Sequence, residues 1–264
     1  MYAFEYHQPQ SLAGAIADLA KPDAKALAGG MTLLPTMKQR LASPAALFDL
    51  KNVHELSGIA REGDNLVIGA MTRHADVAAS KDAKAAIPGL AELASLIGDP
   101  AVRNMGTIGG SIANNDPAAD YPAAALALGA TIVTNKRRIP AQDFFKGLFE
   151  TALEAGELIT QVSFPIPQKA AYMKFRNPAS RYALVGVFVA KTAGGVRVAV
   201  TGAGQNGVFR AADFEKALSA NFSADALNGV SQTADGLISD LHGDADYRAH
   251  LIGVMAKRAV AAAA

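Results

Sequence analysis

Short apolar runs and turn residues alternate along the first 55 residues, a spacing typical of strands and helices that follow one another. Ser11 can cap a helix because its hydroxyl can accept from the free amides of the first turn, and Pro22 ends that helix. The pattern predicts a strand at residues 2–6, a helix at 12–20, a strand at 25–28, a helix at 32–38 that Thr32 caps, and a strand at 47–50.

A second unit with the same mixed pattern begins near residue 56. Turn residues precede an apolar strand, and Thr72 and Pro88 can begin helices. The stretch from Arg103 to Tyr121 is rich in glycine, asparagine and aspartate, so we expect a long loop there. The remaining pattern predicts strands at 66–69, 132–133 and 158–164 and helices at 72–79, 88–97 and 122–128.

Pro165 and Pro167 mark the start of a third unit, in which strands come first and helices follow. That order indicates an α+β domain, with a three-stranded antiparallel sheet and a helical bundle. The expected strands are 172–176, 184–191 and 196–201, and the expected helices are 211–218, 223–239 and 245–262. The predicted organisation is therefore two small α/β subdomains, residues 1–55 and 56–167, followed by a C-terminal domain at 168–264.

Composition and charge exclude several classes of protein. Half of the 264 residues are apolar, and 25 basic residues balance 24 acidic ones to a net charge of +1, which gives no basic field for nucleic acid or an anionic membrane. No run of about 18 apolar residues is present, and the N-terminus lacks a signal-peptide pattern, so we expect a cytoplasmic protein without a membrane span. The basic run at 136–138 is interpreted as the solvated end of a strand.

The usual residues for metal or covalent chemistry are also missing. Without cysteine the chain cannot bind an iron–sulfur cluster through thiolates, form a disulfide or link a flavin to sulfur. None of the five histidines has metal-ligand spacing to a carboxylate partner, so we interpret all five as structural or solvated, with His74 at the surface of the second unit. No metal site and no catalytic residue is therefore predicted.

Two glycine-rich segments carry the candidate binding chemistry. We call residues 28–33 the first glycine segment and residues 107–111 the second glycine segment. Each combines a glycine pair with a hydroxyl, so backbone amides can approach a phosphate closely. Each segment taken alone is also consistent with an ordinary tight turn. Two such segments in one chain favour a shared site that holds one pyrophosphate from two sides.

The stretch from Gly202 to Gly207 fits the G-x-G-x-x-G pattern of a dinucleotide-binding strand-to-helix turn. It would make the chain an NAD-type dehydrogenase. Three residues separate these glycines from the next predicted helix, and only helices follow, so no second strand completes a βαβ unit. The sequence therefore disfavours this alternative.

Three segments together resemble a known family: Ala28-Gly29-Gly30-Met31-Thr32, the stretch Val102-Arg103-Asn104-Met105-Gly106-Thr107-Ile108-Gly109-Gly110-Ser111, and Asp116-Pro117-Ala118-Ala119-Asp120. In this order and spacing they are similar to the FAD-binding medium subunit of the carbon monoxide dehydrogenase and xanthine dehydrogenase (molybdenum hydroxylase) family. The resemblance covers essentially the whole chain. It implies a fold in which two α/β subdomains clasp an extended FAD and a C-terminal domain follows.

The resemblance also assigns roles to individual residues. Both glycine segments would bind the pyrophosphate, Asp120 would bind polar groups near the adenosine half, Lys174 would lie near the flavin ring, and Tyr182 would cover it. The expected cofactor-binding residues are Ala28, Gly29, Gly30, Met31, Thr32, Leu33, Ile97, Thr107, Ile108, Gly109, Gly110, Ser111, Asp120, Ile159, Lys174 and Tyr182. Met31 stands where relatives usually carry a polar residue, so we doubt its side-chain role.

The activity implied by the resemblance is electron transfer through non-covalent FAD. A small subunit with 2Fe-2S clusters would supply the electrons, a large subunit with the molybdenum cofactor would oxidise the substrate, and an external acceptor would receive the electrons. The expected assembly is a dimer of heterotrimers, and the lack of cysteine agrees with clusters held elsewhere. A non-catalytic assembly subunit with a decayed flavin site is the further alternative, motivated by Met31.

Overall fold

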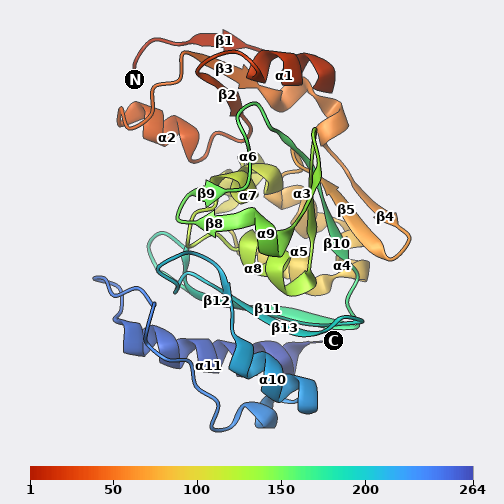
Figure 1. Cartoon of the computed structure of the whole chain (residues 1–264), viewed down its shortest axis with the longest axis vertical. Coiled ribbons are helices and arrows are strands. Elements are labelled where there is room, and N and C mark those ends of the chain that lie inside the picture. Colours follow the sequence, from red (N-terminus) through yellow and green to blue (C-terminus); the bar gives the residue numbers. More distant parts are fainter. Residues whose placement is uncertain (264) are drawn as a thin grey trace.

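The computed structural model describes residues 1–263, and Figure 1 shows three units stacked along the long axis in chain order. The first unit holds a three-stranded parallel sheet in the order β1-β3-β2. Its central strand is buried at all four positions, as expected for a parallel strand covered on both faces. The elements are β1 (Glu5–His7), α1 (Leu12–Leu19), β2 (Ala24–Leu27), α2 (Leu33–Lys38), β3 (Ala46–Asp49) and two short 3₁₀ helices, Leu50–Asn52 and His54–Leu56.

The second unit is built on an antiparallel sheet in the order β4-β5-β10-β6-β7. Its strands are β4 (Ile59–Glu62), β5 (Asn65–Gly69), β6 (Thr131–Thr134), β7 (Arg138–Pro140) and β10 (Ile159–Pro165), and a separate hairpin pairs β8 (Phe145–Gly147) with β9 (Glu150–Thr151). Its helices are α3 (His74–Ala79), α4 (Lys81–Ala86), α5 (Pro88–Ser95), α6 (Pro100–Met105), α7 (Ile108–Asn114), α8 (Tyr121–Leu128) and α9 (Ala141–Phe144).

The expected long loop from Arg103 to Tyr121 is wrong. The helices α6 and α7 occupy most of this stretch, and each has a side chain as its N-cap. Asp99 accepts a hydrogen bond from the amide of Val102, and Thr107 accepts one from the amide of Gly110. These caps compensate for a glycine-rich sequence that disfavours helix. The expected cap by Thr72 is also wrong, because α3 begins after Arg73 and has no side-chain cap.

The C-terminal domain has an antiparallel sheet in the order β11-β12-β13-β14, comprising β11 (Lys169–Arg176), β12 (Ala183–Thr192), β13 (Gly195–Thr201) and β14 (Phe209–Arg210). The three predicted strands are present, and β14 adds a short fourth one. α10 (Ala212–Ala220) and α11 (Ala245–Ala262) follow. The predicted helix at 223–239 is wrong: it is a 3₁₀ turn, Ala224–Leu227, that stops before Gly229 and Gly236, both at positive φ.

The C-terminal sheet lies between the helices of the second unit and its own helices, as Figure 1 shows. Alternate residues point to opposite faces. Tyr172 and Phe188 join the core cluster of the second unit, whereas Val185, Val187 and Val198 join a separate cluster with α10 and α11. The sheet is therefore buried on both faces, and one core runs from the second unit into the C-terminal domain. Within residues 1–263, no helix is both long and apolar enough to cross a membrane.

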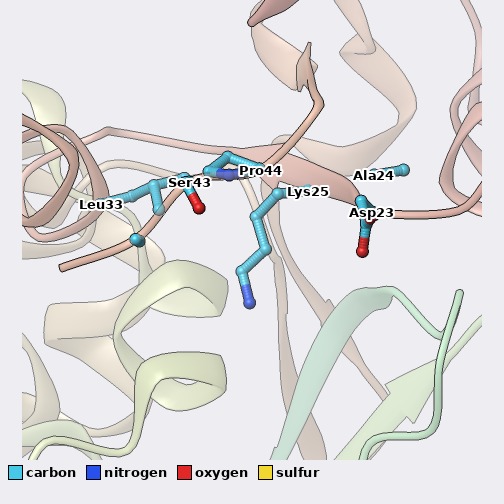
Figure 2. A pocket seen from close by; sticks show the side chains of 7 residues that line it. Asp23, Ala24, Lys25, Leu33, Ser43 and Pro44 are labelled. Atoms are coloured by element: carbon cyan, nitrogen blue, oxygen red, sulfur yellow. The ribbon is translucent and has the colours of Figure 1, made fainter. Parts of the chain in front are cut away.

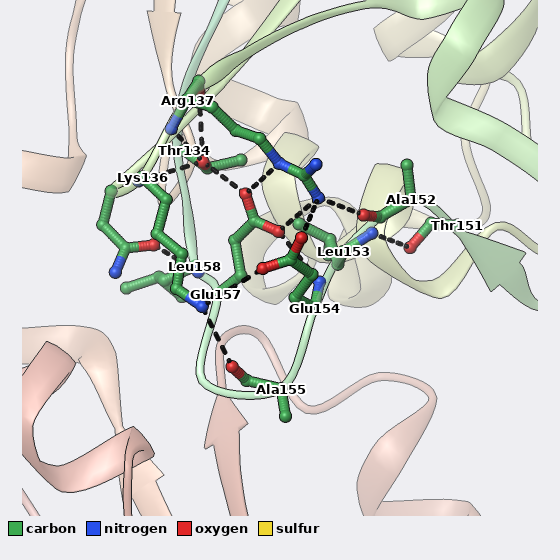
Figure 3. A network of polar contacts seen from close by, with 11 residues as sticks. Thr134, Lys136, Arg137, Thr151, Ala152, Leu153, Glu154, Ala155, Glu157 and Leu158 are labelled. Carbon is green, nitrogen blue, oxygen red and sulfur yellow. Dashed lines mark hydrogen bonds and ion pairs between the residues drawn. The ribbon is translucent and has the colours of Figure 1, made fainter.

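The basic run at 136–138 begins in the turn between β6 and β7 and ends on the first residue of β7. Its middle residue, Arg137, is not simply solvated but is held in a network of hydrogen bonds. Figure 3 shows the Arg137 guanidinium against the carboxylate of Glu157, with Nε and Nη2 each 3.0 Å from an oxygen. Thr134 donates a third hydrogen bond to that carboxylate. Burial alone would raise the pKa of Glu157, but these bonds lower it to about 2. The network ties this turn to the segment that leads into β10.

Candidate functional site

The first glycine segment connects β2 to α2. Gly30 takes φ +71°, a conformation that glycine adopts without strain. Among residues 1–263 no acceptor is found for the backbone amides of residues 29–33, and the first helical bond runs from Leu34 to the Gly30 carbonyl. Thr32 occupies the N-cap position, but its side chain makes no capping bond. Five consecutive amides and one hydroxyl are therefore without an acceptor in the described chain, and donors of this kind can bind an anion.

The second glycine segment begins α7 and differs in its hydrogen bonding. The amides of Ile108 and Gly109 already donate to the carbonyls of Thr72 and Ala70, at 3.1 and 2.8 Å. The amide of Gly110 donates to the Thr107 hydroxyl. The two segments are thus unequal: the first has free donors, whereas the second has a helix N-terminus and small residues that permit close approach.

The two segments lie against each other. A Cβ on Gly29 would overlap the carbonyl oxygen of Met105, so only glycine fits there. A Cβ on Gly110 would lie 3.5 Å from the Cβ of Ala28, which brings the two glycine pairs within one ligand's reach. The predicted pairing of the segments is therefore present in the geometry, although 78 positions separate Gly29 from Thr107 in the chain.

A cavity of about 560 Å³ opens beside this contact, within the size range of small-molecule sites. Both glycine segments contribute to its wall, and Lys51 and Arg73 add positive charge that the sequence did not single out. Its lining residues are Ala28, Gly29, Lys51, His54, Ser57, Gly58, Ile59, Met71, Thr72, Arg73, Asp76, Met105 and Thr107.

A second cavity of about 250 Å³, lined among others by Lys25 and Pro44, is shown in Figure 2. It shares only Leu33 with the predicted site.

His74 is not at the surface as expected but 4% exposed behind the second glycine segment. Its amide donates to the Gly106 carbonyl at 3.0 Å, and a Cβ on Gly106 would lie 2.6 Å from Nε2. Burial, and secondarily the charge of Arg103, lower the pKa of His74 to about 4, so the ring is neutral at pH 7. The imidazole therefore braces the segment from behind, next to the ring of Tyr121 at 5.4 Å between centroids.

Asp120 and Lys174 form a buried ion pair where the second unit meets the C-terminal sheet. Lys174 Nζ lies 2.9 and 3.0 Å from the two carboxylate oxygens and donates to the Leu96 carbonyl at 3.1 Å. Tyr172 donates to the same carboxylate at 2.5 Å. Burial raises the pKa of Asp120, and the Lys174 ammonium and Tyr172 hydroxyl oppose that rise. Asp120 and Lys174, which were predicted to serve different ends of an extended cofactor, are thus in direct contact with each other.

Tyr182 lies in the loop between β11 and β12, close enough to Asp116 and Asp120 for their charges to act on its hydroxyl. Its side chain is 48% exposed, and burial of the hydroxyl together with the carboxylates of Asp116 and Asp120 raises its pKa. Of the two predicted apolar lining residues, Ile97 is half-buried at the end of α5. Ile159 is 3% exposed and packs in the core of the second unit.

The G-x-G-x-x-G stretch does not form a dinucleotide site. Gly202 and Gly207 take positive φ in the connection from β13 to β14, and these strands pair antiparallel. The Gly202 amide donates to the Pro117 carbonyl at 2.8 Å, and Gly204 pairs with Leu237. No parallel βαβ unit is present in this part of the described chain, so the disfavoured NAD-type alternative is excluded by topology.

Comparison with known proteins agrees with this geometry. The carbon monoxide dehydrogenase medium chain of Hydrogenophaga pseudoflava is 39% identical, covering 98% of this chain and 96% of that protein. A solved structure of carbon monoxide dehydrogenase from that organism matches with a TM-score of 0.87 at 40% identity, covering 99% and 97% of the two chains. Quinoline 2-oxidoreductase from Pseudomonas putida 86 matches with a TM-score of 0.88 at 32% identity, covering 98% and 96%.

A family model matches the part of the chain that holds both glycine segments. Residues 2–167, which span both small subdomains and both glycine segments, match the family described as the FAD binding domain in molybdopterin dehydrogenase. The fold relatives cover the C-terminal domain as well. The chain therefore belongs to the FAD-binding flavoprotein family of the molybdopterin dehydrogenases.

Proposed function

We propose that this chain is the electron-transfer subunit of a molybdenum hydroxylase complex and holds one FAD non-covalently. The observation that carries the proposal is the run of five free backbone amides at residues 29–33, set against the N-terminus of α7. A diphosphate is the part of FAD that needs such donors, and a helix N-terminus favours its negative charge. Without cysteine, no link from flavin to sulfur is available.

In this proposal the residues of the chain bind and orient the cofactor, and FAD supplies the capacity to store two electrons. The two glycine segments hold the diphosphate. Asp120 and Lys174 present polar groups at the flavin end, and Tyr182 covers that end. Met31 is 39% exposed, but its backbone amide is one of the five free donors, so the loop keeps its function without a polar side chain.

The proposed partners are inferred from the relatives, which are named medium chains or medium subunits. In this proposal a small subunit with 2Fe-2S clusters delivers the electrons, and this chain, which has no cysteine, holds no such cluster through thiolates. A large subunit with the molybdenum cofactor oxidises the substrate, and the three chains form a heterotrimer that pairs in the cytoplasm. Purification from the native cell under mild conditions should yield all three chains; recovery of this chain alone would contradict the assembly.

Flavin binding tests the proposal directly. The purified chain should show the two visible absorption bands of oxidised flavin, and denaturation should release FAD into the supernatant. Gly29→Ala should weaken FAD binding at least tenfold, because the new Cβ displaces the Met105 carbonyl and parts the two segments. Affinity is measured from the quenching of flavin fluorescence on titration of the apoprotein.

Gly253→Ala is the matched control. Gly253 lies in α11, and a Cβ added there would meet nothing within 4 Å, so alanine should leave FAD affinity unchanged and favour the helix. A chain that is colourless and cannot be reconstituted with FAD would refute the proposal and favour a non-catalytic assembly subunit. Equal affinities for Gly29→Ala and wild type would show that the free amides are not the diphosphate site.

A further inference from the structure

The buried ion pair between Asp120 and Lys174 is joined by Tyr172, a residue to which the family resemblance assigned no role. Tyr172 donates to Asp120 Oδ1 at 2.5 Å. It is 2% exposed, and its ring stacks on Phe188 with 6.1 Å between centroids. Asp120 lies at the N-cap of α8 and Tyr172 on β11, so this hydrogen bond joins the second unit to the C-terminal sheet.

The strand geometry explains how a tyrosine reaches Asp120. Tyr172 and Lys174 are two residues apart on β11, so both side chains project from the same face of the sheet. On the neighbouring strand Gly186 pairs with Lys174, and a Cβ at Gly186 would overlap the Tyr172 hydroxyl and lie 2.9 Å from Thr201 Cγ2. Gly186 does not take a positive φ. Position 186 therefore requires glycine because the Tyr172 hydroxyl occupies the volume that a Cβ would need.

The rest of the surroundings fix Asp120 from the other side. Thr201 donates to the carbonyls of Pro117 and Ala119 at 3.1 and 2.6 Å, which holds the loop that leads to Asp120. The titratable groups near the Asp120 carboxylate are Lys174 and Tyr172 on β11, Tyr121 on α8, and Tyr182 in the loop between β11 and β12. Lys174 is the only basic group among these four, so each donor to the carboxylate matters for its ionisation.

We propose that Tyr172, in the space left by Gly186, is a positioning residue that keeps Asp120 ionised and fixed beside Lys174, where the proposed function places polar contacts to FAD. Tyr172 acts through Asp120 and does not touch the cofactor. The inference rests on the proposed function, because it assigns Tyr172 a role in how this chain holds FAD. A carboxylate with one donor removed is both less fixed in direction and easier to protonate.

Tyr172→Phe tests the proposal, since it keeps the ring and removes only the donor. In the full-length chain its affinity for FAD, titrated by fluorescence quenching, should fall about tenfold at pH 7. The acid limb of the affinity profile should move up by about one pH unit, because Asp120 then takes up a proton more readily. Tyr121→Phe is the matched control: its hydroxyl is buried, neighbours Asp120 and has no partner among residues 1–263, so neither quantity should change.

Gly186→Ala gives an independent test that does not alter Tyr172. The added methyl should displace the hydroxyl and weaken FAD binding as Tyr172→Phe does. In the Tyr172→Phe background, the same change should weaken binding less than twofold further, because the crowded hydroxyl is already gone. Tyr172→Phe with a lowered melting temperature but an unchanged pH profile would reduce Tyr172 to a structural residue and overturn the inference. A wild-type chain that binds no FAD would instead overturn the proposed function, and this inference with it.

Discussion

At the scale of single residues, His74 makes the stability of the chain depend on pH. In the folded protein its pKa is about 4, whereas an unfolded histidine titrates near 6.5. Between these values the unfolded chain binds more protons than the folded chain, so the free energy of unfolding falls as pH decreases. The stability from His74 is complete above pH 6.5 and is lost progressively toward pH 4. We expect a loss of about 2 kcal/mol between pH 7 and pH 5.

The measurement is urea unfolding at the two pH values, for wild type and for His74→Leu. In the His74→Leu variant, the decrease in the free energy of unfolding that His74 causes between pH 7 and pH 5 should be absent, whatever the variant's absolute stability. His54→Gln serves as the control, because His54 is exposed and its replacement should leave the slope as in wild type. A His74→Leu variant that keeps the full loss between pH 7 and pH 5 would show that other groups carry it.

Single residues of the site were predictable from sequence to different degrees. Gly29 and Gly110 stand in short motifs whose chemistry is local, so the pattern located them. Asp120 and Lys174 are 54 positions apart, and no sequence pattern predicts that they are in contact. Tyr172 was missed altogether, and its one signal was the two-residue spacing to Lys174 on a predicted strand. Contacts that tertiary packing creates are not encoded in any local period.

At the scale of elements, the β8–β9 hairpin depends on one residue at the end of α7. Asn115 caps α7 in a left-handed conformation with φ +44°, is 2% exposed, and donates through Nδ2 to the carbonyls of Gly147 and Glu150 at 2.8 and 2.9 Å. Its own carbonyl accepts from the amide of Phe149. The helix of the second glycine segment and the hairpin are therefore joined through this side chain.

Replacement of Asn115 should separate conformational strain from lost hydrogen bonds. Asn115→Gly keeps the left-handed backbone but leaves two carbonyls without their donor, at a cost of about 2 kcal/mol. Asn115→Ala loses the same bonds and adds about 1 kcal/mol for a Cβ in the left-handed region. Chemical unfolding should therefore rank wild type above the glycine variant and the glycine variant above the alanine variant. Equal stability of the two variants would mean that the backbone there relaxes.

Elements were predictable where apolar runs and helix signals agree, as for β10, β12, β13 and α11. They were not predictable where caps or glycines decide the outcome. α6 and α7 form in a glycine-rich stretch because Asp99 and Thr107 cap them, whereas the helix predicted after Ser223 stops as a 3₁₀ turn before Gly229. Propensity summed over a window misses such single-residue effects.

At the scale of the whole molecule, the boundary near residue 167 separates segments of sequence but not independent cores. Tyr172, Phe188 and Ala199 of the C-terminal sheet belong to the same buried cluster as Leu90 and Leu128 of the second unit. A Cβ on Gly89 of α5 would lie 3.0 Å from the Cα of Ala171, which shows how closely helix and sheet approach. The C-terminal sheet thus completes the core of the unit that carries the second glycine segment.

A fragment of residues 1–167 contains the whole of the family match and both glycine segments, yet we expect it not to fold stably on its own. It would expose the faces of α5 and α8 that the sheet covers, and it would lack Tyr172 and Lys174, leaving the buried carboxylate of Asp120 without either partner. The fragment should bind a hydrophobic dye and unfold without a cooperative transition, whereas the full chain should unfold cooperatively and bind little dye. A fragment that unfolds cooperatively and takes up FAD with the affinity of the full chain would show that the C-terminal sheet is dispensable for the site, and would also remove the basis for a positioning role of Tyr172.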